Sequence, residues 1–401
     1  MGPKAASAEP TGAARFGRVK ANLRMGIVGL PNVGKSSLFN LLTEQSAAAE
    51  NYPFCTVEPN IARCPVPDQR YDWLCEVWQP PSTYPAYLNL TDIAGLIRGA
   101  SEGAGLGNAF LSHIQAVDGI FHCVRAFESE EVTHVDDSVD PCRDLDTIQS
   151  ELCKKDMAYV AAQREARERD CKKTPNAKLP PLFYSTLDKV EAMLADNIPV
   201  RTGDWTAPEV EKINELIPQC ITTKPLVYLV NLSQKAFVSK KSKWLPKIAE
   251  WVAAHGGGTI IPFSVEFEQA LWDFNDDEDG RAAFLATCGA GVKSVLPRMV
   301  KVGYRVLQLI YFFTAGETEV RCWTIPQGAL APQAAGAIHS DFERGFIKAE
   351  VVSFADFKEL ADGKSMAAIK AAGKYRQEGK QYVVADGDII HFQFNVTTKK
   401  K

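Results

Sequence analysis

The segment Gly29–Ser36, GLPNVGKS, constrains this chain more than any other feature of the sequence. It fits the phosphate-binding pattern G-x-x-x-x-G-K-[ST]. The apolar run Leu23–Val28 precedes it and a helical pattern begins at Ser36, so the loop joins a buried strand to a helix. Backbone N–H groups of such a loop surround the β-phosphate at the helix N-terminus. The segment therefore predicts a nucleoside triphosphate site on an α/β sheet domain.

Residues inside the loop have distinct expected roles. Lys35 is expected to bridge the β- and γ-phosphates, and the hydroxyl of Ser36 is expected to bind Mg²⁺. Asn32 places an amide carbonyl near the phosphates, where it is a candidate ligand for a monovalent cation such as K⁺. The alternative for Asn32 is an amide that only stabilises the loop.

Two further segments have the spacing of nucleotide-sensing loops. Asp92-Ile-Ala-Gly95 ends the apolar strand Tyr87–Leu90, so Asp92 is expected to reach Mg²⁺ through water. Thr56 lies in the interval between the two motifs, where a threonine can close over the nucleotide and bind Mg²⁺; its alternative is an ordinary loop threonine. Leu96 stands where small G proteins have a glutamine, so another group, a cation or a partner must position the attacking water.

The base-recognition element departs from the guanine-reading pattern N-K-x-D. After the strand Leu226–Val230 the chain has Asn231-Leu-Ser-Gln234. A carboxamide offers one acceptor and a donor, so Gln234 cannot match the paired N–H donors of guanine as a carboxylate does. The sequence therefore argues against guanine specificity.

The remaining apolar runs predict a doubly wound, mostly parallel sheet with two additions. Strands are expected at Ile120–Val124 and Thr259–Phe263. Helical periodicity between the third and fourth strands predicts an antiparallel hairpin, and Thr206 with Glu209 predicts a capping box at the start of a third helix. From Gly303 onward, strands are expected at Val306–Phe313, Glu319–Ile325, Phe346–Val352 and Asp388–Phe394 and a short helix at Ala331–Ile338, which predicts a small α+β domain. The expected boundaries are a disordered tail at 1–22, a sheet domain at 23–140 and 206–300, a helical insert at 141–205, a C-terminal domain at 304–395 and a basic tail at 396–401.

Composition excludes several classes of protein. The 401 residues carry a net charge of −4, which favours no particular partner, and the ten cysteines form no C-x-x-C pair. No run is long enough for a signal peptide or a transmembrane helix. We expect a cytoplasmic protein without a membrane partner.

Four strings give the chain a clear family resemblance: GLPNVGKSSLFN at 29–40, ENYPFCTVEPN at 50–60, TDIAGLIRGASEGAGLGNAFLSHI at 91–114 and YLVNLSQ at 228–234. They resemble the YchF, or Obg-like ATPase, family, and residues 312–350 with 383–395 are similar to its TGS domain. The resemblance implies a G domain, a coiled-coil insert and a TGS domain of β-grasp fold. It also implies hydrolysis of ATP, often in preference to GTP, and a link to ribosomes, translation and stress responses.

The resemblance also implies roles for individual residues. The phosphate-binding set is Asn32, Val33, Gly34, Lys35, Ser36 and Ser37, and the metal set is Ser36, Thr56 and Asp92. Asn231, Leu232 and Ser264 are expected at the adenine base. His134 is expected to replace the missing glutamine as the catalytic group, although without the resemblance it would be an ordinary solvated loop histidine. The usual acid of the family's N-x-x-E element is Gln234 here, which leaves base selectivity open.

Two other functions stay open at this stage. The chain could be a regulatory module that binds ribosomes or proteins with minimal turnover, with RNA contacts through the helical arm or the TGS domain. It could also be a true GTPase if Gln234 reads guanine.

Overall fold

A computed structural model describes residues 14–49, 61–93, 107–129, 132–134, 138–360 and 367–395. Its first sheet has the strand order β2-β4-β1-β5-β6-β7. The strands are β1 (Arg24–Val28), β2 (Ile61–Pro65), β4 (Tyr87–Asp92), β5 (Gly119–Arg125), β6 (Leu226–Asn231) and β7 (Thr259–Phe263). All neighbours pair in parallel except β2, which runs antiparallel to β4. The doubly wound, mostly parallel sheet is confirmed.

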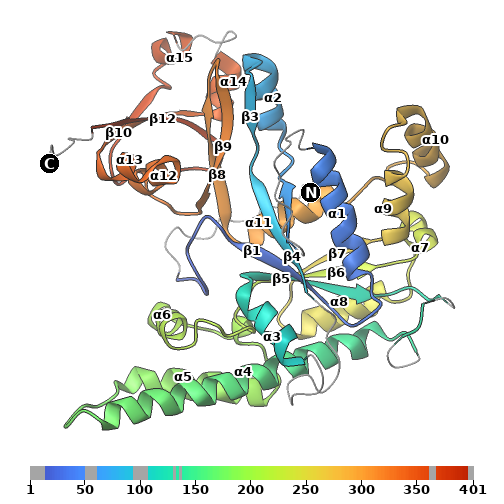
Figure 1. Cartoon of the computed structure of the whole chain (residues 1–401), viewed down its shortest axis with the longest axis vertical. Coiled ribbons are helices and arrows are strands. Elements are labelled where there is room, and N and C mark those ends of the chain that lie inside the picture. The colour runs from blue at the N-terminus through green and yellow to red at the C-terminus, as the bar shows by residue number, and fades with distance from the viewer. Residues whose placement is uncertain are drawn as a thin grey trace, which may run out of the picture.

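Helices cover both faces of this sheet (Figure 1). The helices of this part of the chain include α1 (Lys35–Ala49), α2 (Gln69–Trp78), α3 (Gly107–Ala116), α6 (Ala207–Leu216), α7 (Gln234–Ser239), α8 (Leu245–Ala254), α9 (Val265–Trp272), α10 (Glu278–Cys288) and α11 (Leu296–Val306), although not all of them lie on the sheet. Alternating residues of β6 serve two cores: Val227 and Leu229 join the large cluster with α1, whereas Tyr228 and Val230 pack with α8. This burial on both faces explains the uninterrupted apolar run of a parallel strand.

The expected helical hairpin is present as α4 (Pro141–Lys172) and α5 (Pro181–Ala195), which project from the sheet as an arm (Figure 1). Arg164 of α4 joins the two helices through ion pairs to Asp188 at 2.8 Å and Glu191 at 2.7 Å. At the base of the arm, the fully buried Asp156 accepts hydrogen bonds from the backbone N–H groups of Ile221 and Thr222. The arm is thereby fixed to the segment that leads into β6.

The C-terminal part forms a second sheet in the order β11-β10-β12-β8-β9-β3. Its elements are β8 (Leu309–Ala315), β9 (Glu319–Pro326), α12 (Ala331–Ile338), α13 (Ser340–Arg344), β10 (Phe346–Ser353), α14 (Phe354–Leu360), α15 (Ala367–Ala371), β11 (Arg376–Glu378) and β12 (Asp388–Phe394). The sheet packs on α12 through Phe312, Phe346 and Phe392, as expected of a β-grasp arrangement. The strand predicted to begin at Val306 is wrong at its start, because α11 continues to that residue.

One strand of the second sheet comes from the first domain. The strand β3 (Ser82–Tyr84) pairs in parallel with β9, which the sequence did not indicate. Beside it, Arg70 forms ion pairs with Asp68 at 2.7 Å and with Asp386 at 2.9 Å, and the hydroxyl of Tyr311 donates to Asp68. The C-terminal domain is therefore joined to the sheet domain by backbone pairing and by a polar network.

Part of the expected N-terminal tail is ordered. Phe16 packs against Trp205 with ring centroids 6.5 Å apart, and Arg18 forms a 2.7 Å ion pair with Asp118. The prediction of a disordered segment at 1–22 is thus wrong for residues 14–22, which gain apolar and charged partners only in the folded chain. Residues 1–13 and the tail at 396–401 lie outside the described residues. Among the described residues, no helix combines the length and apolar character needed to cross a membrane.

Candidate functional site

The loop Gly29–Ser36 leaves the end of β1 and enters α1, as the sequence predicts. Gly34 has φ of +98°, and an added Cβ there would stand 2.5 Å from Asn231 Nδ2. A side chain at this position would therefore suffer both an unfavourable backbone conformation and a collision. The second loop glycine is required because another side chain occupies the space behind the loop.

That other side chain, Asn231, ties three segments together. Its Nδ2 donates to the carbonyl of Val33 at 3.0 Å, and its Oδ1 accepts from the backbone N–H of Val265 at 3.1 Å. Asn231 is only 3% exposed. The asparagine predicted to contact adenine thus holds the phosphate loop against the start of α9, a positioning role that the sequence reading did not assign.

Lys35 is buried at the centre of the loop. Its ammonium donates to the carbonyl of Leu30 at 2.6 Å. Burial lowers the pKa of the Lys35 ammonium, while Cys123 and Asp92 oppose this shift. A bound triphosphate would strengthen the opposing effect, because its anionic oxygens favour the charged form. The ammonium of Lys35 therefore lies inside the loop that the sequence predicts to bind phosphates.

Ser36 and Asp92 meet beside Lys35. Ser36 Oγ donates to Asp92 Oδ2 at 3.0 Å, and among the described residues the buried Asp92 Oδ1 has no hydrogen-bond partner. Burial raises the pKa of Asp92, with Ser36 and Lys35 opposing the shift. A hydroxyl next to a carboxylate with an unpaired oxygen is a donor set that suits Mg²⁺. The two described residues of the expected metal set therefore fit the ion, whereas Thr56, Gly95 and Leu96 lie outside the described residues.

The base-recognition segment, residues 231–234, is held by the end of β7 and the start of α9. Leu232 is buried, and its backbone N–H donates to the carbonyl of Phe263 at 2.8 Å. Ser264 is fully buried, and its Oγ caps α9 by accepting from the backbone N–H of Phe267 at 3.3 Å. The side chains of Leu232 and Ser264 are thus structural, so only their backbone is suited to a base contact.

Gln234 begins α7, and its backbone N–H donates to the carboxylate of Glu266 at 3.0 Å. The sequence reading missed Glu266, an exposed acid that approaches the backbone of the position where the family has its own acid. Its only signal in the sequence was its place two residues after Ser264, just beyond the last parallel strand, where the structure has the first turn of α9.

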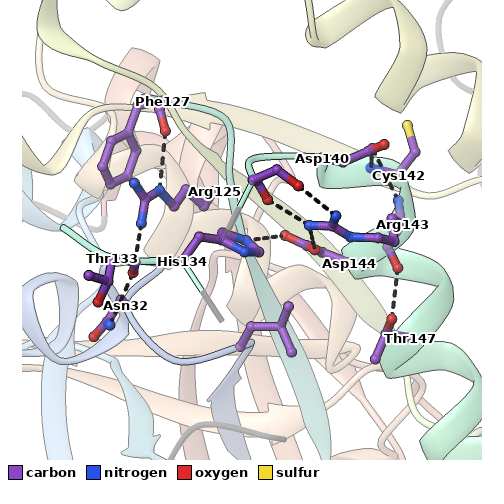
Figure 2. A network of polar contacts seen from close by, with 12 residues as sticks. Asn32, Arg125, Phe127, Thr133, His134, Asp140, Cys142, Arg143, Asp144 and Thr147 are labelled. Carbon is purple, nitrogen blue, oxygen red and sulfur yellow. Dashed lines mark hydrogen bonds and ion pairs between the residues drawn. The ribbon is translucent and has the colours of Figure 1, made fainter. Parts of the chain in front are cut away.

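His134 lies at the other side of the site and is not solvated. Its side chain is 3% exposed, and Nε2 lies 2.9 Å from Asp144 Oδ2 (Figure 2). Burial raises the pKa of Asp144, while His134 and Arg143 oppose the shift. The ordinary exposed loop histidine is therefore the wrong description for this residue. The sequence reading also missed Asp144, four residues after the N-cap Asp140.

The residue before His134 touches the phosphate loop. The carbonyl of Thr133 accepts from Asn32 Nδ2 at 3.2 Å and from Arg125 Nη1 at 3.3 Å (Figure 2). Arg125 also donates to the carbonyls of Val132 at 2.9 Å and Phe127 at 3.1 Å. Asn32 has φ of +61°, in the left-handed region that asparagine tolerates. Since its amide nitrogen faces Thr133, its carbonyl oxygen remains the candidate ligand for a cation.

Val33, Ser36 and Ser37 are the remaining members of the predicted phosphate-binding set. The buried Val33 contributes its carbonyl to Asn231 and to the thiol of Cys123. Burial raises the pKa of Cys123 to about 12, so this thiol stays neutral. Ser36 and Ser37 are exposed in the first turn of α1, where helix N–H groups favour an anion. The structure thus brings the whole predicted phosphate set together.

Two family models match the chain. One is described as YchF-GTPase_C, a protein of unknown function (DUF933), and matches residues 309–395. The other is described as MMR_HSR1, a 50S ribosome-binding GTPase, and matches residues 24–162.

Full-length relatives are similar as well. Obg-like ATPase 1 of Oryza sativa subsp. japonica is 54% identical over 400 residues, with 99% of each chain covered. Obg-like ATPase 1 of Homo sapiens is 51% identical over 389 residues, with 96% of each chain covered. The solved structure of the Schizosaccharomyces pombe YchF GTPase has a TM-score of 0.83 and 44% identity, covering 95% of this chain and 100% of that one. The relatives are named ATPases and the solved structure a GTPase, so the base must be argued from the site.

Proposed function

Because this chain belongs to the Obg-like ATPase, or YchF, family, we propose that it binds ATP and hydrolyses it to ADP and phosphate as a nucleotide-dependent switch. The observation that carries this proposal is a complete phosphate loop beside a base segment that lacks the guanine-reading carboxylate. Lys35, Ser36 and Asp92 supply the first half of the observation, and Gln234 supplies the second.

The phosphate loop binds and orients the triphosphate. Lys35 neutralises charge at the β- and γ-phosphates, and the N–H groups of Asn32 to Ser37 surround them. Ser36, Thr56 and Asp92 would hold Mg²⁺, as the unpaired oxygen of Asp92 supports. Charge neutralisation between the β- and γ-phosphates is the chemistry that Mg²⁺ supplies when bound. K⁺ near Asn32 would add to this neutralisation.

The hydrolytic step needs a group that orients water, because Leu96 cannot hydrogen-bond. We assign this role to His134, whose backbone neighbour Thr133 is bonded to the loop residue Asn32. The imidazole would accept a proton from the attacking water as the γ-phosphoryl group leaves ADP. Lys35 and His134 thus act on the two ends of the transferred group.

Adenine is the proposed base. Asn231 and Leu232 would border it through their backbone, because the Asn231 side chain is occupied by Val33 and Val265. Gln234 offers no carboxylate to the paired donors of guanine, and a site without that pairing loses its preference for guanine.

The proposed setting is the cytoplasm, with the ribosome as partner. This rests on the family model described as a 50S ribosome-binding GTPase and on the projecting arm α4–α5. The arm, or the C-terminal domain as a TGS module, would supply contacts to RNA. Arg344, Lys348 and Lys374 are weak candidates for such contacts, because each has a carboxylate partner within 4 Å.

The experiment that tests the proposed function compares affinities for labelled ATP and GTP on the purified chain. We expect ATP to bind at least as well as GTP. A tenfold preference for GTP, about 1.4 kcal/mol, contradicts the ATPase assignment and favours a true GTPase. Single-turnover hydrolysis with and without ribosomes then separates an enzyme from a regulatory module: turnover that stays negligible in both conditions supports the module.

A further inference from the structure

The side chain of His134 points away from the phosphate loop. Figure 2 shows its ring directed toward α4, where Nε2 meets Asp144 Oδ2, while Asn32 lies on the opposite side of Thr133. A group that orients water at the γ-phosphate must face the loop. In this orientation the His134 ring therefore cannot reach a water molecule at the γ-phosphate.

We propose that Asp144 is a positioning residue that stores His134 in an inactive orientation, so that breaking the His134–Asp144 contact limits the rate of ATP hydrolysis. The inference rests on the proposed function, in which His134 orients the attacking water. It adds a residue that touches neither nucleotide nor water and that acts only through the histidine.

Asp144 is well placed to hold the ring. It lies in the first turn of α4, where the helix dipole favours a carboxylate, and Asp140 caps the same turn by accepting from the backbone N–H groups of Cys142 and Arg143. Arg143 Nη2 lies 3.4 Å from Asp144 Oδ1, and its guanidinium also donates to Ser138. The carboxylate is thus held by its helix and by a neighbouring cation, with Oδ1 facing Arg143 and Oδ2 facing His134.

The backbone beside His134 is held by contacts that do not involve Asp144. Arg125 is 2% exposed and donates to the carbonyls of Val132 and Thr133, while Asn32 fixes Thr133 from the phosphate loop. Two separate sets of contacts therefore exist: one keeps the chain next to the phosphates, and the other keeps the imidazole turned away from them. Rotation of one side chain connects the two orientations, and it requires exchange of a buried hydrogen bond.

Removal of the carboxylate should therefore raise the rate of hydrolysis. If the stored orientation holds nine tenths of the molecules, its loss raises the competent fraction by up to about tenfold. We expect Asp144→Ala to accelerate single-turnover ATP hydrolysis by about tenfold without changing ATP affinity. Asp144→Asn keeps the shape but loses the charge, so it should give a smaller acceleration, about two- to fivefold.

Matched control variants distinguish loss of the His134–Asp144 contact from a general loosening of α4. Asp146→Asn removes a carboxylate two residues away, which accepts from Trp251 Nε1 at 2.8 Å, and it should leave the rate unchanged. In the His134→Ala background, Asp144→Ala should have no effect on the rate. The chain has six histidines, so ¹³C-labelled imidazoles can be followed by NMR, and the resonance lost in His134→Ala should shift in Asp144→Asn.

Three results would overturn the proposal. A rate that falls in both Asp144 variants makes the carboxylate an orienting partner that aids catalysis, and an unchanged rate makes the contact purely structural. Equal acceleration with and without His134 shows that Asp144 acts by another route. In each of these cases the proposed function still stands, because the wild type hydrolyses ATP. A wild type that does not hydrolyse ATP contradicts the proposed function, and the NMR shift then still reports whether Asp144 contacts His134.

Discussion

The phosphate loop and the His134 segment lie side by side but differ in how far they are assembled. In the phosphate loop, Asn231 and Lys35 already bond to loop carbonyls, and Ser36 already meets Asp92. In the His134 segment the backbone is bonded to the same loop, but the ring faces Asp144. The comparison indicates a molecule that is organised to bind a triphosphate before it is organised to hydrolyse one. Slow intrinsic turnover would follow from this difference.

The largest effect is expected for Lys35→Ala. Lys35 is the one lysine of the loop Gly29–Ser36, so removal of its ammonium should abolish triphosphate binding, a loss on the order of 100-fold or more for a charged hydrogen-bonding group. Equilibrium titration with labelled ATP measures it, and the unfolding temperature without nucleotide checks that the variant folds. Unchanged affinity would show that the assembled loop is not the binding half of the site.

His134→Ala should give the opposite pattern. We expect hydrolysis to fall about 10²–10⁴-fold while ATP affinity stays nearly unchanged, as for a group that acts mainly in the transition state. His391→Ala, at an exposed position of β12, is the matched control. If affinity falls together with the rate, binding and catalysis are not divided between the two segments.

Asp92 tests whether Mg²⁺ binding belongs to the phosphate loop, the part of the site that is already assembled. Because burial raises the pKa of Asp92, this carboxyl takes up a proton at a higher pH than an ordinary aspartate and then no longer suits Mg²⁺. Mg²⁺-dependent ATP affinity should therefore fall as the pH is lowered from a neutral to an acidic value, and the fall should begin at a higher pH than for an ordinary aspartate. Asp92→Asn should reduce affinity about tenfold at neutral pH and remove most of this pH dependence. Titrations with Mg²⁺ or EDTA at both pH values measure the effect, and an unaltered pH profile in the variant would contradict it.

Asn231→Ala should weaken the loop before nucleotide arrives. The substitution leaves the carbonyl of Val33 and the N–H of Val265 without their partner, which costs about 1–3 kcal/mol per buried group. We expect a lower free energy of unfolding without nucleotide and a partial recovery when ATP is added. A variant as stable as the wild type would mean that the loop is held together by its ligand.

The smallest effect is expected at Asn32, which contacts both segments. If its carbonyl oxygen holds a cation, replacement of K⁺ by Na⁺ should slow hydrolysis a few-fold, on the order of 0.5–1 kcal/mol. Asn32→Ala should remove the difference between the salts. Equal wild-type rates in both salts would leave Asn32 as the amide that joins the loop to Thr133.

The structure also changes how base choice can be engineered. Leu232 is buried among apolar side chains, so a lysine there would place an ammonium in the core. A carboxylate at Gln234 would stand near Glu266 and be opposed by its charge. Conversion toward guanine by Leu232→Lys with Gln234→Asp therefore demands repacking as well as the new pairing.

Local patterns were enough for much of the fold. The strand Thr259–Phe263 and the helix Ala331–Ile338 occur with the predicted bounds, because an apolar run and a helical period report burial directly. Glu209 accepts from the N–H of Thr206, as the predicted cap requires, although the Thr206 hydroxyl also bonds to that carboxylate. By contrast, β3 is three residues long and gains its partner more than two hundred residues later, which no local pattern encodes.

By itself the sequence determined the phosphate loop, the sheet that carries it and the missing guanine-reading acid, because each depends on residue types at fixed spacing. Tertiary structure alone decided that Asn231 braces Val33 and Val265 and that Asp144 holds His134. Those contacts join segments whose side-chain directions depend on packing, and spacing along the chain carries no information about them. The identities of the candidate functional residues could therefore be predicted from the sequence, whereas the orientations of their side chains were set by the fold.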